Sequence, residues 1–184
     1  MSTMHRLLES VLKAVRTATR GSQRGGAGRG RTGRGQRGGA PQGGAPADLG
    51  GYPGDFAGTP RISYEPVQDD LPDPGEVVWA WVPYEEDHTQ GKDRPVLVIG
   101  RDGDLLLALQ MSSQDHDKDA ADEARWGRYW VDVGSGAWDR ERRPSEARVD
   151  RILRIDPESV RRIGAVLDRQ RFDEVAAGVR QHAR

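Results

Sequence analysis

The 184-residue sequence contains no cysteine. Without thiols the chain can form neither disulfides nor thiolate metal sites, and it has no cysteine nucleophile. It also has no apolar run close to the roughly 18 residues that a membrane-spanning helix needs. The apolar positions in its first 20 residues are periodic rather than continuous, which is not the pattern of a signal peptide. These absences predict a cytoplasmic protein without a transmembrane segment.

Acidic side chains are scarce at the N-terminal end of the chain. Residues 1–50 carry 9 Lys and Arg against 2 Asp and Glu, a net charge of +7. Residues 51–184 carry 19 against 27, a net charge of −8. The overall charge of −1 therefore hides a basic segment attached to an acidic body.

Large apolar side chains are missing from most of the basic segment. Residues 1–20 place methionine and aliphatic side chains at helical spacing, which predicts a short amphipathic basic helix. Such a helix could rest on an anionic membrane, contact a partner or have no separate task. Residues 21–73 are Gly/Arg-rich and then Gly/Pro-rich, so we expect a disordered linker. Its Arg-Gly units favour nonspecific binding of nucleic acid through counterion release.

The folded domain is predicted over residues 74–184, the size of one small domain. Its first strand is EVVWAWV, residues 76–82, whose two faces are both apolar, so it should be covered on both sides. Pro83 ends this strand. Residues 84–91 are polar and lack periodicity, which predicts a loop.

A hairpin is predicted next, with strands at 95–100 and 105–111. Asp102-Gly103 between them is a favoured pair for a type I′ turn. Pro95 has no backbone donor, so it is expected at the first residue of its strand. The charged residues 92–94 should then lie at the rim, where the loop enters the sheet.

Two further strands are predicted at 129–133 and 147–155. Asp156-Pro157 is typical of a helix start, with aspartate as the N-cap and proline at the first helical position. Two helices should follow, marked by Val160, Ile163 and Leu167, and by Phe172, Val175, Ala176 and Val179. Strands followed by helices predict a mainly β fold with C-terminal helices packed on a small curved sheet.

Four stretches together carry a family resemblance: GEVVWAWVP, KDRPVLVIGR, LLALQMSS and SEARVDRILRID. In this order, over about residues 75–182, they resemble the PemK/MazF toxins of type II toxin-antitoxin systems. The resemblance implies an SH3-like β-barrel, the CcdB-MazF-PemK toxin fold, and a homodimer. It also implies a sequence-selective mRNA interferase, an endoribonuclease that cleaves single-stranded mRNA with no metal or other cofactor. The partner implied is a cognate antitoxin.

The resemblance carries the family's functional positions onto four residues of this chain. The arginine of the R-P motif falls on Arg94, and the residue closing the strand after the hairpin falls on Ser112. The later motif falls on Arg148 and Asp150. These four are the candidate catalytic residues. The candidate RNA-binding residues are Lys92, Ser113, Trp126 and Arg151, and Arg151 departs from the glutamine usual in the family.

The expected chemistry matches these residue types. Cleavage by the neighbouring 2′-hydroxyl passes through a phosphorane, to which a guanidinium offers two donors and a serine hydroxyl a third. Arginine is a poor general base near neutral pH. Proton transfer is therefore open among Arg94, Asp150 and two loop histidines, His88 and His116.

Structural roles compete with each of these assignments. Arg94 could pair with a nearby aspartate, Ser112 could simply end a strand, and Arg148 and Asp150, which share a strand face, could form only an ion pair. Most tryptophans suit a core or a dimer contact, although Trp126 and Trp138 have polar surroundings and could stack on bases.

Acidic residues crowd the segment 115–123, which would repel phosphate. Two other functions stay open, and the acidic segment favours the first of them. One is a catalytically inactive module of the same fold that binds nucleic acid or protein. The other is a CcdB-like poison of a topoisomerase.

Overall fold

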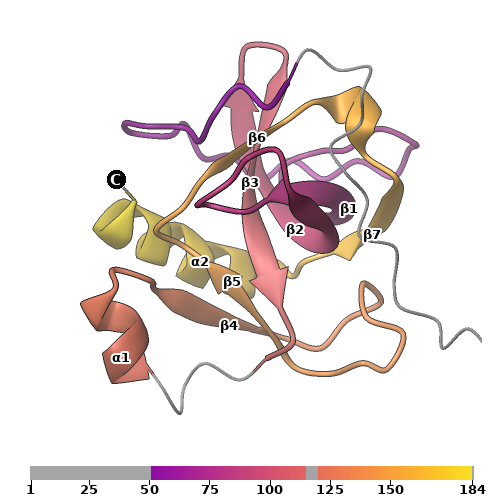
Figure 1. The fold of residues 1–184 in the computed structure, drawn as a ribbon. Coiled ribbons are helices and arrows are strands. Elements are labelled where there is room, and N and C mark those ends of the chain that lie inside the picture. Colours follow the sequence, from indigo (N-terminus) through magenta and orange to yellow (C-terminus); the bar gives the residue numbers. More distant parts are fainter. Residues whose placement is uncertain (1–50, 115–119, 184) are drawn as a thin grey trace, which may run out of the picture. The chain divides into compact units, whose positions relative to one another are not determined.

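The computed structural model describes residues 51–114 and 120–183, and their secondary structure is mainly antiparallel sheet with one long helix at the C-terminal end (Figure 1). The strands are β1 (Glu76–Pro83), β2 (Gly91–Asp102), β3 (Leu105–Ser112), β4 (Trp130–Gly134), β5 (Ser145–Arg148), β6 (Leu153–Ile155) and β7 (Arg162–Val166). The helices are α1 (Ala120–Arg125), a 3-10 turn (Pro157–Ser159) and α2 (Arg169–His182). The strand order is β4-β5-β3-β2-β1-β7, with β6 also paired to β3. The prediction of a mainly β fold is confirmed.

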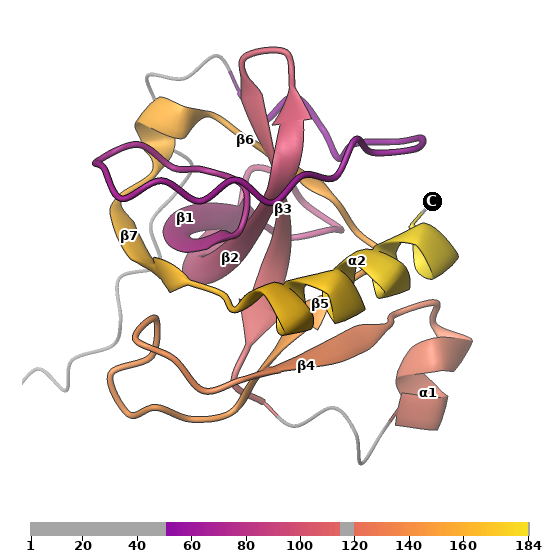
Figure 2. The ribbon, with the colours of Figure 1, turned by 180° about the vertical axis from the view of Figure 1, so that it is seen from behind.

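Two apolar clusters bury the two faces of the central strands. One contains Val77 of β1 and Leu97 of β2 together with Phe172 and Val175 of α2. The other contains Val78 on the opposite face of β1. Helix α2 lies across the sheet, as Figure 2 shows from behind. The apolar pattern of residues 76–82 therefore has the predicted cause, since β1 is covered on both sides.

The first of the two predicted C-terminal helices is a strand. Residues 162–166 form β7, which pairs with β1 through Val78 and Ile163. Gly164 disfavours a helix at this point, and a Cβ there would lie 2.9 Å from the carbonyl oxygen of Val77. The helical spacing of the apolar residues predicted the wrong element here. The segment is a strand because it pairs with the otherwise open edge of β1. The prediction of α2 holds.

The hairpin and the strand after it also differ in detail from the sequence prediction. Asp102 pairs with Leu105, so the two turn residues are Gly103 and Asp104. Gly103 has φ 61° and Asp104 has no positive φ, which is the pattern of a type II′ turn rather than type I′. The strand predicted over 147–155 is broken, because β5 pairs with the end of β3 and β6 with its middle.

Strand β2 begins at Gly91, earlier than predicted. Residues 92–94 therefore lie within the ladder with β1, not at its rim. Pro95 is tolerated inside the strand because the ladder with β3 begins only at Val96, where it pairs with Gln110.

Residues 52–66, here called the strap, pack on the domain although the sequence predicted a linker as far as residue 73. Phe56 bridges to Ile152, and Ile62 bridges to Gly100. The Tyr64 ring meets Phe172 edge-on at 5.0 Å between centroids. A few large apolar side chains are enough to hold the strap on the domain. The average composition of the Gly/Pro-rich stretch did not indicate this. The predicted helix at 1–20 and the linker as far as residue 50 lie outside the described residues.

No helix within residues 51–114 and 120–183 is long and apolar enough to cross a membrane.

Candidate functional site: an arginine-lined cleft

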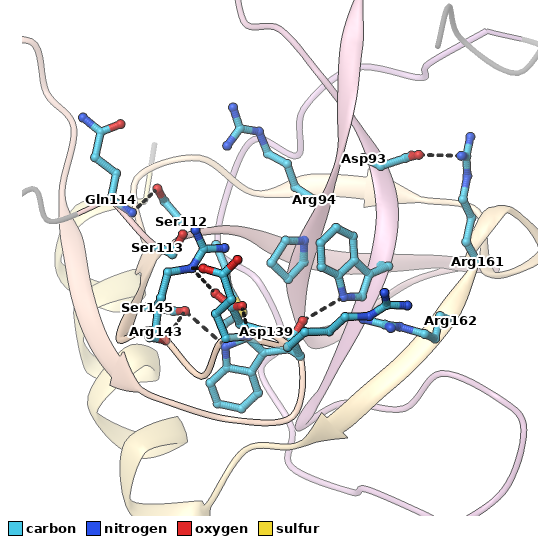
Figure 3. A pocket seen from close by; sticks show the side chains of 16 residues that line it. Asp93, Arg94, Ser112, Ser113, Gln114, Asp139, Arg143, Ser145, Arg161 and Arg162 are labelled. Atoms are coloured by element: carbon cyan, nitrogen blue, oxygen red, sulfur yellow. Dashed lines mark hydrogen bonds and ion pairs between the residues drawn. The ribbon is translucent and has the colours of Figure 1, made fainter. Parts of the chain in front are cut away.

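A cleft of about 730 Å³ opens where β3 separates from β2. The two strands are paired as far as Val96 and Gln110, after which Met111 and Ser112 pair with β5 instead. The cleft is bordered by both strands, by β1, by the start of β7 and by the loop between β4 and β5, residues 135–144. Figure 3 shows the side chains that line it.

Arg94 and Ser112 both border the cleft at this point of separation. Each lies two residues beyond the last pair of the β2–β3 ladder, Val96 and Gln110. The Arg94 side chain is half-buried, and no hydrogen bond or ion pair joins it to any residue that the structure describes. The Ser112 hydroxyl accepts the Gln114 backbone N–H at 3.1 Å. A guanidinium without a partner among the described residues and a serine hydroxyl thus border the same cleft.

The loop between β4 and β5 is fixed from inside by Trp138. Its side chain is 3% exposed, and its indole N–H donates to the Ser145 hydroxyl at 3.1 Å. Its carbonyl accepts the Trp79 indole N–H at 3.2 Å. Asp139 at the rim accepts Arg143 at 2.7 Å, and this hydrogen bond holds the pKa of Asp139 below its usual value. Trp138 is therefore a structural anchor and not a stacking surface.

The far end of the cleft is formed by the start of β7. Arg161 pairs with Asp93, and the Arg162 guanidinium lies 5.2 Å from the centroid of the Trp79 ring. Figure 3 shows Arg161 and Arg162 across the cleft from Ser112, Ser113 and Gln114. The cleft therefore has a serine end and a β7 end.

Positive charge is in excess along the cleft. It is lined by five arginines and three carboxylates. Arg143 pairs with Asp139 and Glu141, and Arg161 pairs with Asp93. Three arginines, Arg94, Arg140 and Arg162, have no carboxylate partner among the described residues. A concave surface with unpaired guanidinium groups favours polyanions.

Arg148 and Asp150, which do not line this cleft, form a buried ion pair. Their side chains are 8% and 2% exposed, and Arg148 Nη2 lies 2.7 Å from Asp150 Oδ2. Arg148 also donates to Glu85 at 3.0 Å, and Asp150 accepts the Tyr129 N–H at 2.8 Å. Burial alone would lower the pKa of Arg148, but the hydrogen bonds to Asp150 and Glu85 raise it.

Arg94 also borders a second cavity, of about 140 Å³, which Arg148 and Arg151 help to line. Arg151 is 5% exposed in its side chain and donates to Asp55 of the strap at 2.8 Å and to the carbonyl of Pro83 at 3.0 Å. The departure from the family's glutamine therefore has a structural use, because Arg151 joins the strap to the end of β1.

The other predicted residues are scattered. Ser113 borders the cleft. Lys92 borders neither cavity and lies 5.9 Å from the Tyr84 ring centroid, while Trp126, 75% exposed, also borders neither. His88 packs edge-on against Tyr52 at 5.0 Å between centroids. His116 and most of the acidic segment lie outside the described residues.

Sequence reasoning missed the β7 end of the cleft. Because a helix was predicted for their segment, Arg161 and Arg162 were not considered as residues of the site. Trp79 was assigned to a strand covered on both sides. The signal present in the sequence was a pair of adjacent arginines beside an apolar run. No cluster of three or more metal-ligating side chains occurs in the described part of the chain.

Comparison with known proteins identifies the family. Residues 73–183 match the model of the PemK-like, MazF-like toxin of type II toxin-antitoxin systems, so the chain belongs to this family. A chain in the crystal structure of MazE-MazF (form II) from Deinococcus radiodurans is similar at 21% identity, with a TM-score of 0.43. That similarity covers 61% of this chain and 96% of the other. No curated protein matches the sequence.

Proposed function

We propose that this toxin is a metal-independent endoribonuclease that cleaves single-stranded mRNA in the cytoplasm at selected sequences. The observation that carries the proposal is that Arg94, which has no side-chain partner among the described residues, and Ser112 border the same cleft, where positive charge is in excess. Family membership supports the same activity. In this site the guanidinium supplies the positive charge that a metal ion supplies in other nucleases.

The reaction begins with attack of a 2′-oxygen on the adjacent phosphorus. The bond to the 5′-oxygen breaks, which leaves a cyclic phosphate and a 5′-hydroxyl. The 2′-hydroxyl gives up its proton, and the 5′-oxygen takes one. Arg94 donates to two phosphate oxygens, and Ser112 adds a neutral donor, so both hold the charge that builds up in the phosphorane.

Arg148 and Asp150 act in this proposal as positioning residues. The Asp150 carboxylate already accepts hydrogen bonds from the Arg148 side chain and from the Tyr129 backbone N–H. Both of its oxygens therefore have donors, and we do not assign proton transfer to it. The pair instead supports the cavity wall next to Arg94. His88 borders neither cavity, and the rim residues Ser113 and Gln114 are exposed, so we assign proton exchange in the cleft to water.

The test uses the full chain and a long unstructured RNA in excess EDTA. We expect discrete cuts with cyclic phosphate ends and a loss of about a hundredfold or more in rate for Arg94→Ala. Arg169→Ala is the matched control, since Arg169 lies on α2 and borders neither cavity. Intact RNA from folded protein would contradict the proposal, as would equal loss of activity in both variants.

The inactive binding module remains the second candidate, because Arg148, Asp150 and Arg151 are all held in internal ion pairs. Binding of RNA without cleavage in the same assay would favour it. Intact RNA together with arrested topoisomerase would favour a CcdB-like poison instead. In the nuclease proposal the protein is a homodimer restrained by an antitoxin that covers the cleft, and occupancy by the antitoxin should abolish cleavage.

A further inference from the structure

We propose that Tyr52 and Asp55 of the strap are positioning residues for Arg94. They hold the β1–β2 loop, residues 84–90, in a position from which its glutamates do not pair with Arg94. The inference rests on the proposed function in one respect, since it takes an RNA phosphate as the ligand of Arg94. It gives the strap, which lies outside the region that matches the family, a part in keeping that arginine available.

Arg94 shares its smaller cavity with two glutamates of the loop. Glu85 and Glu86 both border this cavity of about 140 Å³, and neither pairs with Arg94 among the described residues. Opposite charges that share so small a space attract each other, and a pair would occupy the donors that a phosphate needs. An unpaired arginine beside two carboxylates therefore requires a device that keeps the carboxylates in place.

The two glutamates differ in how they are held. Glu85 accepts from the Arg148 guanidinium at 3.0 and 3.4 Å, so both of its oxygens are engaged. Glu86 is exposed, and no hydrogen bond or ion pair joins its side chain to another residue in the part of the chain that the structure describes. The position of the loop backbone is therefore what keeps Glu86 away from Arg94.

The loop is tied together internally. The Asp87 carboxylate accepts the Thr89 backbone N–H at 3.0 Å, the Thr89 hydroxyl at 2.6 Å and the Gln90 side-chain amide at 2.7 Å. The Tyr84 backbone N–H donates to the Gln90 carbonyl at 2.8 Å, which closes the loop at its base. A loop bonded in this way moves as a unit, so its contacts with the rest of the domain set the position of all its residues.

Two of these contacts lead to the strap. At the base of the loop, Arg151 donates to the Pro83 carbonyl at 3.0 Å and to the two oxygens of Asp55 at 2.8 and 3.1 Å. Further along the loop, the His88 ring packs edge-on against Tyr52, whose hydroxyl donates to the same Asp55 carboxylate. Tyr52 also packs on one of the two apolar clusters of the core. The strap therefore fixes the loop at two points.

The experiment measures amide hydrogen exchange in residues 84–90 and the affinity of the full-length protein for a 2′-O-methyl oligonucleotide, which cannot be cleaved. Tyr52→Ala and Asp55→Asn each weaken one fixed point, so we expect the loop to lose protection and binding to weaken about tenfold, as for one hydrogen bond to a charged group. For Asp55→Asn, charge alone predicts the opposite direction, because loss of a carboxylate favours binding of a polyanion. Asp173→Asn removes an arginine partner on α2 and should weaken neither protection nor binding.

Glu86→Gln tests the cause of the weaker binding. In the two strap variants it should restore most of the lost affinity, whereas in the unaltered chain it should change binding much less. Equal effects of Glu86→Gln in both backgrounds would overturn the proposal, as would unchanged loop exchange or unchanged binding in the strap variants. Binding that Arg94→Ala leaves unchanged would also overturn it. A protein that shows the strap dependence of binding but cuts no RNA retains the positioning role and loses the nuclease assignment.

Discussion

At the scale of single residues, an arginine side chain either stabilises the fold or stays available to a ligand, depending on whether carboxylates pair with it. Arg94 and Arg148 lie on nearby strands and border one small cavity. Arg94 has no partner among the described residues, whereas Arg148 is held by Asp150 and Glu85. A cation whose donors are occupied can stabilise the fold but cannot receive a phosphate. Sequence position does not distinguish the two, because pairing depends on which side chains the fold brings close.

The Arg148–Asp150 pair gives a prediction that separates structure from catalysis. Arg148→Ala leaves Asp150 buried without its partner, so we expect a loss of about 3–5 kcal/mol in the free energy of unfolding. Denaturant unfolding measures this loss. The double variant Arg148→Ala/Asp150→Ala should lose less free energy of unfolding than Arg148→Ala alone. An Arg148→Ala variant as stable as the unaltered chain would contradict the ion-pair assignment.

At the scale of elements, the strap is held to the sheet by charge as well as by apolar contacts. Asp55 accepts from Arg151, and Arg154 donates to the Asp55 carbonyl at 2.8 Å. Residues 51–72 precede the region that matches the family model, yet they use arginines within that region. The strap therefore lies outside the matched region but is held in place by arginines within it.

The strap predicts a pH dependence of stability. Burial alone would raise the pKa of Asp55, but hydrogen bonds from Arg151 and Tyr52 outweigh it and lower the pKa from 3.8. Because the pKa of Asp55 is depressed in the folded state, its contribution to the free energy of unfolding is fully present above about pH 4. That contribution is lost as the pH falls through the folded-state pKa. Thermal unfolding between pH 3 and 7 should show a smaller acid loss for Asp55→Asn than for the unaltered chain. Parallel curves would argue against this contribution.

At the scale of the whole molecule, the chain separates charge by segment. The first 50 residues carry +7 and the remainder −8, while the cleft itself has more arginines than carboxylates. An acidic body with a basic cleft directs a polyanion to one place, and the basic segment can add affinity without adding sequence preference.

Deletion of residues 1–44 tests this division of charge. The deleted segment holds all 9 Lys and Arg of the first 50 residues, so the slope of log affinity for RNA against log salt should become shallower. The preferred cut sites should stay the same, because the cleft is untouched. Fluorescence anisotropy across a salt series measures the slope. An unchanged slope would exclude a role for this segment in RNA binding.

The sequence by itself determined the first three strands, the C-terminal helix and the family, because period-two and helical patterns and the R-P motif are local. The family resemblance also pointed to Arg94 and Ser112, and both border the cleft. Only the tertiary structure decided that residues 162–166 are a strand, that the strap is docked, and that Arg148 and Arg151 are paired while Arg94 is not. The Trp79–Arg162 contact belongs to the same group. These features depend on partners far apart in the chain, and such pairings follow from packing rather than from local pattern.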